Sequence, residues 1–381
     1  MTSSTAMLQG GPARNGVYPE ETAPQDFRPW RFRPGRHRSL RSPSVCDGTV
    51  YVCSQDGVCY ALSALTGTVR WSTAVGERMD SDPPVVSDGV VCVTDAIGRL
   101  YALGAEDGQE RWRHRFDGPV RLVADNGVVY GVDSAWLYNR GANPAELFAL
   151  NLASGELLWR TDVFDRAMTH PALADGRIFH TSEFGDLTAY DAATGDRLWR
   201  VTCDSRWVGM ANSPCVGDRV VYAAVQSTLF AHAAEDGEVL WSRAYEGLIR
   251  SSVSVLGDTV YFSTKPHSRR DRPASYAVDA ATGEIRWQLA NRDGASAIAL
   301  SGSSGWIVSG RDINYLYAVD LATGTRRWKR YLGPKGGTVP VLWNGIAFVA
   351  THEDRLNAID ARTGHVPSPF RGRRSWTTVT T

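Results

Sequence analysis

Tryptophan recurs along this chain at intervals of 40 to 47 residues. The recurring positions are Trp30, Trp71, Trp112, Trp159, Trp199, Trp241, Trp287 and Trp328. Every one after the first follows an alanine ten residues earlier and a glycine four residues earlier, as in Ala61, Gly67 and Trp71. A period of this length is typical of architectures that repeat one supersecondary unit. The chain is therefore expected to be an array of similar units rather than a set of unrelated domains.

Each unit reads as four β-strands, A to D. A pair such as Asp47-Gly48, which tolerates the positive φ of a hairpin turn, precedes a β-branched or aromatic run such as residues 50–52. A second run follows, then another turn and the strand that carries tryptophan. One such sheet cannot bury both faces, so the units must stack, and radial stacking leaves only short edges. We predict an all-β fold, an eight-bladed β-propeller of four-stranded antiparallel blades, in which the tryptophans hold blades together.

The first and last units are incomplete in complementary ways. Residues 340–361 supply three strands with Ala358 and Gly364 in register, but Ser368 stands where tryptophan is expected. Trp30 has no strands A to C before it. We predict that the strand at Trp30 completes the C-terminal blade and closes the ring. The expected organisation is a lead-in at residues 1–27, one propeller at 28–366 and a tail at 367–381.

The charge balance and the distribution of apolar residues limit which partners this chain is expected to have. Lys and Arg together number 41, as do Asp and Glu, so no net field favours nucleic acid or an anionic membrane. The first 40 residues hold no apolar run of seven, which predicts no secretory signal, and we expect a cytoplasmic monomer.

The six cysteines lie in strand-like apolar runs and are predicted to be buried thiols. Cys53 and Cys59 flank one hairpin, so a bridge between them is left open.

The spacing of alanine, glycine and tryptophan resembles the tryptophan-docking motif of pyrroloquinoline quinone (PQQ) repeat propellers. That family includes quinoprotein alcohol dehydrogenases and the outer-membrane assembly lipoprotein BamB. The resemblance covers about residues 8 to 366, and the opening Gly11 to Tyr18 is similar to the lead-in of small bacterial members. The dehydrogenase site needs calcium and adjacent cysteines, and this sequence has no Cys-Cys pair. We therefore expect no PQQ, no calcium and no other metal.

The D-to-A and B-to-C loops of a propeller emerge on one face, and ligands of scaffolds prefer such concave ends. A histidine oriented by a carboxylate can act as acid or base near neutral pH. The candidate catalytic residues on this face are His170, Asp80, Asp82, Glu183 and Tyr138. The candidate ligand-binding residues are Arg41, Arg121, Asn212, Arg250, Trp136, His267, Arg269, Arg311 and His352. Two B-to-C loops, around residues 134–145 and 265–273, exceed the regular period and are expected to carry specificity.

Each of these assignments has an alternative in which the residue has a purely structural role. His170 precedes Pro171 and could simply be a strand-end residue bonded to backbone, and Trp136 could be a loop anchor. Two function classes follow: a binding module that holds a small molecule or protein in the funnel, or a cofactor-independent lyase, isomerase or cyclase of a bacterial biosynthetic pathway. An open pocket with His170 against a carboxylate favours the enzyme. A funnel filled by residues 1–16 or by the inserted loops favours the binding module.

Overall fold

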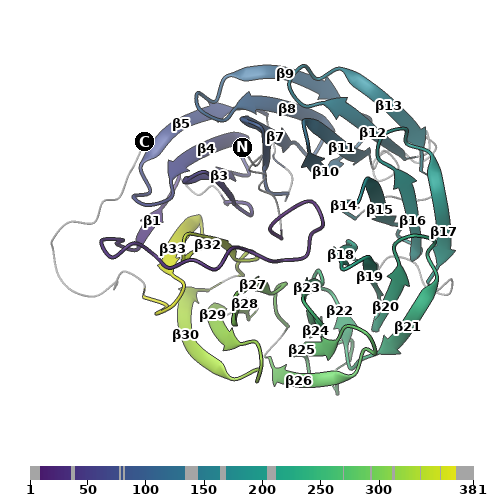
Figure 1. The fold of residues 1–381 in the computed structure, drawn as a ribbon. Coiled ribbons are helices and arrows are strands. Elements are labelled where there is room, and N and C mark those ends of the chain that lie inside the picture. The colour runs from purple at the N-terminus through teal and green to yellow at the C-terminus, as the bar shows by residue number, and fades with distance from the viewer. Residues whose placement is uncertain are drawn as a thin grey trace.

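The computed structural model describes residues 9–35, 39–76, 79, 82–133, 145–163, 169–203, 212–268, 270–291, 294–310, 314–334, 336–351 and 353–365. In this part of the chain the strands form eight antiparallel sheets arranged in a ring (Figure 1). Seven sheets have four strands, and the remaining one has two short strands, β22 and β23, in its inner position. The predicted eight-bladed propeller is confirmed.

The blades are numbered along the chain, with the inner strand of each given first. Blades one to four are β2 (Ser44–Cys46), β3 (Thr49–Cys53), β4 (Val58–Ser63), β5 (Val69–Ala74); β6 (Val85–Ser87), β7 (Val90–Thr94), β8 (Arg99–Gly104), β9 (Glu110–Arg115); β10 (Val120–Asp125), β11 (Val128–Asp133), β12 (Glu146–Asn151), β13 (Leu157–Asp162); β14 (Ala172–Ala174), β15 (Arg177–Thr181), β16 (Asp186–Asp191), β17 (Arg197–Thr202).

The other four blades follow the same order. They are β18 (Cys215–Gly217), β19 (Val220–Val225), β20 (Thr228–Ala233), β21 (Val239–Ala244); β22 (Leu248–Ile249), β23 (Ser254–Leu256), β24 (Thr259–Lys265), β25 (Ala274–Asp279), β26 (Ile285–Ala290); β27 (Ala299–Ser301), β28 (Ser304–Ser309), β29 (Asn314–Asp320), β30 (Arg326–Gly333); β31 (Val341–Trp343), β32 (Ile346–Thr351), β33 (Arg355–Asp360), β1 (Trp30–Phe32).

The repeated tryptophan joins each blade to the next. Trp71 stands opposite Ala61 on β4, whose small side chain leaves space for the indole. The indole N–H donates to the carbonyl of Ala105 in blade two at 2.9 Å. Gly108 of the same turn has φ +65°, and a Cβ there would lie 2.5 Å from the Trp71 ring. The glycine is therefore required both by backbone conformation and by the close approach of the indole.

The N-terminal strand closes the ring. On β1, Trp30 is the partner of Ala358, and Phe32 is the partner of Leu356, both on β33. The Trp30 indole donates to the Ala64 carbonyl of blade one at 2.9 Å. Blade eight thus combines both ends of the propeller sequence, as the orphan tryptophan predicted.

Residues 9–23, named here the lead-in segment, run through the middle of the ring (dark purple in Figure 1). Their carbonyls accept hydrogen bonds from the inner strands of four successive blades. The pairs are Leu173 N to Pro12 O (2.9 Å), Val216 N to Ala13 O (2.9 Å), Val255 N to Asn15 O (2.8 Å) and Leu300 N to Gly16 O (2.8 Å). The lead-in segment therefore satisfies backbone donors that would otherwise face the channel.

The structure shows the state of the cysteines and whether any described helix could cross a membrane. All six cysteines are free thiols, including Cys53 and Cys59, which are direct partners across β3 and β4. The bridge left open between these two is not formed. Among the described residues, no helix has the length and apolar character needed to cross a membrane.

Candidate functional site

The loops that follow strands D and B lie side by side, as the topology predicts. Isolated bridges join Leu40 to Ser54 and Met79 to Asp95, each linking the residue that precedes an inner strand to a B-to-C loop. The ends of successive blades thereby bring side chains that are distant in sequence onto one face.

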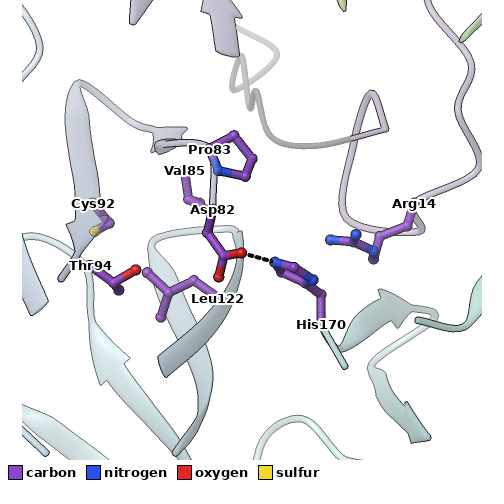
Figure 2. A pocket seen from close by; sticks show the side chains of 8 residues that line it. All are labelled: Arg14, Asp82, Pro83, Val85, Cys92, Thr94, Leu122 and His170. Carbon is purple, nitrogen blue, oxygen red and sulfur yellow. Dashed lines mark ion pairs between the residues drawn. The ribbon is translucent and has the colours of Figure 1, made fainter. Parts of the chain in front are cut away.

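Three of the predicted site residues converge on that face. Asp82 precedes β6, Arg121 lies in β10, and His170 precedes β14, so each comes from a different blade. Arg121 Nη1 lies 2.7 Å from Asp82 Oδ2. His170 Nε2 lies 3.0 Å from Asp82 Oδ1 (Figure 2). Their side chains are only 12 to 16% exposed. The expected contact between His170 and a carboxylate is present.

Burial and charge fix the protonation of this cluster. Burial alone would raise the pKa of Asp82, but the electrostatic and hydrogen-bond interactions of its carboxylate with His170 and Arg121 outweigh burial and hold that pKa well below its usual range. Burial lowers the pKa of His170 more than the Asp82 carboxylate raises it. At neutral pH the imidazole is therefore neutral, and Arg121 balances the ionised Asp82.

Ser213 extends the cluster on the other side of the imidazole. Its Oγ accepts a hydrogen bond from the backbone N–H of His170 at 2.9 Å and lies 3.5 Å from Nδ1. Ser213, His170 and Asp82 have the residue types of a hydrolase triad. Ser213 is buried, with 9% of its surface exposed, and its Oγ already accepts the hydrogen bond from the His170 backbone. Ser213 was not predicted, because nothing in the sequence distinguishes it from other loop serines.

Arg14 enters the cluster from the lead-in segment and was also missed. It is 1% exposed, and its Nε and Nη2 have no hydrogen-bond partner. Burial lowers the pKa of Arg14 to about 10, with nearby Asp82 opposing the shift, so the guanidinium stays charged at neutral pH. Figure 2 shows it on the side of His170 away from Asp82. The surrounding small and polar residues gave no sign that this arginine is buried.

The space among these side chains is small. A cavity of about 10 Å³ is lined by Arg14, Asp82, Pro83, Val85, Cys92, Thr94, Leu122 and His170. That volume holds about one water molecule. PQQ, which is a tricyclic quinone, does not fit this cavity. The His170 contact expected of an enzyme is thus found beside a cavity with room for about one water molecule, next to the lead-in segment.

The other described candidates lie elsewhere on the loop face. Arg41 Nη2 donates to the Met79 carbonyl at 3.3 Å. Asn212 Nδ2 donates to the Ile249 and Ser251 carbonyls at 2.5 and 3.1 Å. Both therefore tie neighbouring loops together. Arg250 and His267 are exposed, and Glu183 is half-buried in the turn between β15 and β16.

Six predicted residues cannot be placed. Asp80, Trp136, Tyr138, Arg269, Arg311 and His352 lie outside the described residues. Within the described ranges, no group of three or more His, Cys, Asp or Glu side chains is arranged to hold a metal ion.

The chain was compared with known proteins. A family model described as outer membrane protein assembly factor BamB matches residues 22–123, 98–206, 183–313 and 312–367. The chain belongs to the BamB family. BamB from Shewanella oneidensis is 25% identical over an alignment of 244 positions that covers 55% of this chain and 60% of that protein.

Other relatives of this BamB-family chain differ in their named activities. Tetrathionate hydrolase from Acidithiobacillus ferrooxidans is 23% identical over 274 residues, which are 68% of this chain. The match spans only half of that hydrolase. Quinohemoprotein alcohol dehydrogenase from Comamonas testosteroni superposes with a TM-score of 0.76 at 12% identity, covering 97% of this chain and 82% of the dehydrogenase. At that identity the structural likeness establishes the fold alone.

Proposed function

We propose that this BamB-family chain is a binding propeller that holds a protein partner on its D-to-A and B-to-C loop face, without PQQ or calcium chemistry. The observation that carries the proposal is the lead-in segment, whose backbone is bonded to the inner strands of four blades. A channel that the protein's own lead-in segment enters, beside a cavity of about 10 Å³, suits a binding surface better than a substrate chamber.

The loop face supports a protein rather than a small molecule as partner. It exposes the cationic side chain Arg250, the imidazole of His267 and the apolar side chain of Ile97, which is 49% exposed. Broad surfaces that mix arginine, aromatic and apolar side chains are typical of protein interfaces. The name of the Shewanella relative, an assembly factor for outer membrane proteins, points in the same direction.

A double substitution, Arg250→Glu with His267→Glu, is expected to weaken partner binding by about tenfold, which corresponds to about 1.4 kcal/mol. The partner is first crosslinked in the native host and identified by mass spectrometry. Its affinity for the purified wild-type chain and for the double variant is then measured by calorimetry.

The matched control is Arg197→Glu, an exposed arginine at the start of β17, on the opposite face of the ring. This variant should bind within about twofold of the wild type, because it leaves the loop face unchanged. The proposed surface would be contradicted if the purified chain and its partner formed no complex, or if the control lost as much affinity as the double variant.

A second candidate function, a cofactor-independent lyase, isomerase or cyclase, is favoured by the 3.0 Å contact between His170 and Asp82. Under the binding proposal, purified protein should convert nothing in a metabolite extract followed by mass spectrometry. If the wild type does convert a metabolite, His170→Ala and Asp82→Asn should each reduce the rate by at least about a hundredfold. Conversion that survives both substitutions would remove these residues from any catalytic role.

A further inference from the structure

A second cavity lies between blades two and three, formed by residues other than those of the central cluster. Its volume is about 310 Å³, within the range of small-ligand pockets. The lining residues are His114, Arg115, Phe116 and Asp117 of blade two, with Asp133, Glu146, Phe148, Leu150, Leu157 and Arg160 of blade three. We call this cavity the inter-blade groove.

A glycine on β11 creates the aromatic floor of the groove. Gly131 is the partner of Phe148 on β12, and a Cβ on it would lie 2.2 Å from the phenyl ring. The ring therefore rests over bare backbone and stacks on Phe116 of blade two, with centroids 4.2 Å apart and planes 15° from parallel. In blade four, His180 holds the position of Gly131, so this opening is particular to blade three.

Carboxylates gather at one end of the groove. Asp133, the last residue of β11, is 4% exposed. Its Oδ2 accepts a hydrogen bond from the backbone N–H of Asp117 at 3.1 Å, whereas its Oδ1 has no partner. Burial and the nearby charges of Asp117 and Glu146 raise the pKa of Asp133 to about 6, although the backbone N–H groups of Asp117 and Gly118 oppose the shift. Three carboxylates, those of Asp117, Asp133 and Glu146, therefore lie close together at this end of the groove.

The carboxylate of blade four that corresponds to Glu146 is neutralised by an arginine. There Asp186 forms an ion pair with Arg200 and accepts a hydrogen bond from Thr202 Oγ1 at 2.6 Å. Glu146 and Arg160 are the equivalents in blade three, counted from the repeated alanine and tryptophan. No ion pair joins these two within the part of the chain that the structure covers. Among the described residues, the carboxylate of Glu146 is thus not neutralised in the way that Asp186 is.

We propose that the inter-blade groove binds the ammonium group of a small organic monoamine, whose apolar body lies against Phe116 and Phe148. An ammonium offers three donors, which suit the unpartnered Oδ1 of Asp133 and the carboxylate of Glu146. Stacked aromatic rings favour both an apolar body and a nearby cation. Arg115 and Arg160 line the same groove and repel a second positive charge, which favours a monoamine over a polyamine.

The test uses 2-phenylethylamine as the probe, with neutral 2-phenylethanol and anionic phenylacetate as matched compounds, in calorimetric titrations at pH 8. The amine should bind at least about tenfold more tightly than either analogue. Asp133→Asn and Glu146→Gln should each weaken amine binding by roughly tenfold. Asp125→Asn, at the other end of the same blade, should leave the affinity unchanged.

The pH profile adds an independent readout. Below about pH 6 Asp133 becomes protonated and loses its attraction for a cation, so the amine should bind more weakly at pH 5 than at pH 8. Asp117, Glu146, His114, Arg115 and Arg160 also line the groove, and Asp133→Asn separates their effects from that of Asp133. Its profile should be flatter than that of the wild type.

Three outcomes would overturn the proposal. They are equal affinity for 2-phenylethanol, unchanged affinity in both carboxylate variants, and no amine binding at about 10 mM. Glu146→Gln keeps the test valid if Asp133→Asn fails to fold, because Glu146 is half-exposed. The proposed protein-binding face plays no part in these titrations, so either proposal can fail alone.

Discussion

Replacing Trp30 by alanine is expected to open the propeller ring at the junction of blades eight and one. The indole is 7% exposed, and a Cβ on Gly67 of blade one would lie 2.6 Å from its ring. Removing a buried tryptophan costs about 3 to 5 kcal/mol of unfolding free energy. The three residues of β1 pair with β33, and the Trp30 ring also packs against Phe348 of blade eight with centroids 5.9 Å apart, so the substitution removes a contact to blade eight as well as the one to blade one.

Trp71→Ala is the matched control for this prediction. Trp71 is similarly buried, at 9% exposure, and makes the same type of indole hydrogen bond. Its strand β5, however, follows β4 through a short turn and remains tethered after the indole is lost. Both variants should melt earlier than the wild type, but only Trp30→Ala should lose hydrogen-exchange protection along β33. Equal protection of β33 in the two variants would contradict the predicted opening.

The fold could be predicted from the sequence because each blade repeats one local contact. Alanine, glycine and tryptophan at fixed spacing place an indole beside a small residue and against the next blade's turn, as seen for Trp71. The closure followed from one exception, Trp30. The path of the lead-in segment could not be predicted, since its backbone carbonyls make the bonds to the inner strands. Such bonds leave no pattern of side chains in the sequence.

The candidate site was predictable only in part. Loop topology correctly brought His170 toward Asp82, because both precede inner strands. It could not show that Arg121 pairs with the same carboxylate or that Arg14 reaches the cavity from the lead-in segment. The inter-blade groove depends on Gly131 and Asp133, which read as ordinary strand residues. Cavities of this kind arise where two blades meet, which the pattern of one blade does not reveal.

A chain that begins at Pro24 is expected to lose at least about 5 kcal/mol of unfolding free energy. The deletion removes five backbone hydrogen bonds to the inner strands, the four described above and one from Tyr18 N–H to the Leu300 carbonyl, at about 1 kcal/mol each. Three bonds that involve the side chains of Gln9, Glu21 and Ser301 are lost as well, so about 5 kcal/mol is the backbone share alone. It also removes Tyr18, which is 7% exposed. Chemical denaturation of the truncated and full chains measures the difference. An unchanged midpoint would mean that the lead-in segment adds nothing to the stability of the propeller.

The same truncation should expose His170 to solvent. Diethyl pyrocarbonate modifies accessible neutral imidazoles, so His170 should react at least about tenfold faster in the truncated chain than in the full chain, as measured by peptide mass spectrometry. His267 is exposed in the full chain and should react at the same rate in both. Arg14→Ala keeps the backbone bonds of the lead-in segment and should give an intermediate rate. If His170 reacts equally in all three chains, the lead-in segment does not control access to the central cluster, and the main support for a binding rather than a catalytic propeller is lost.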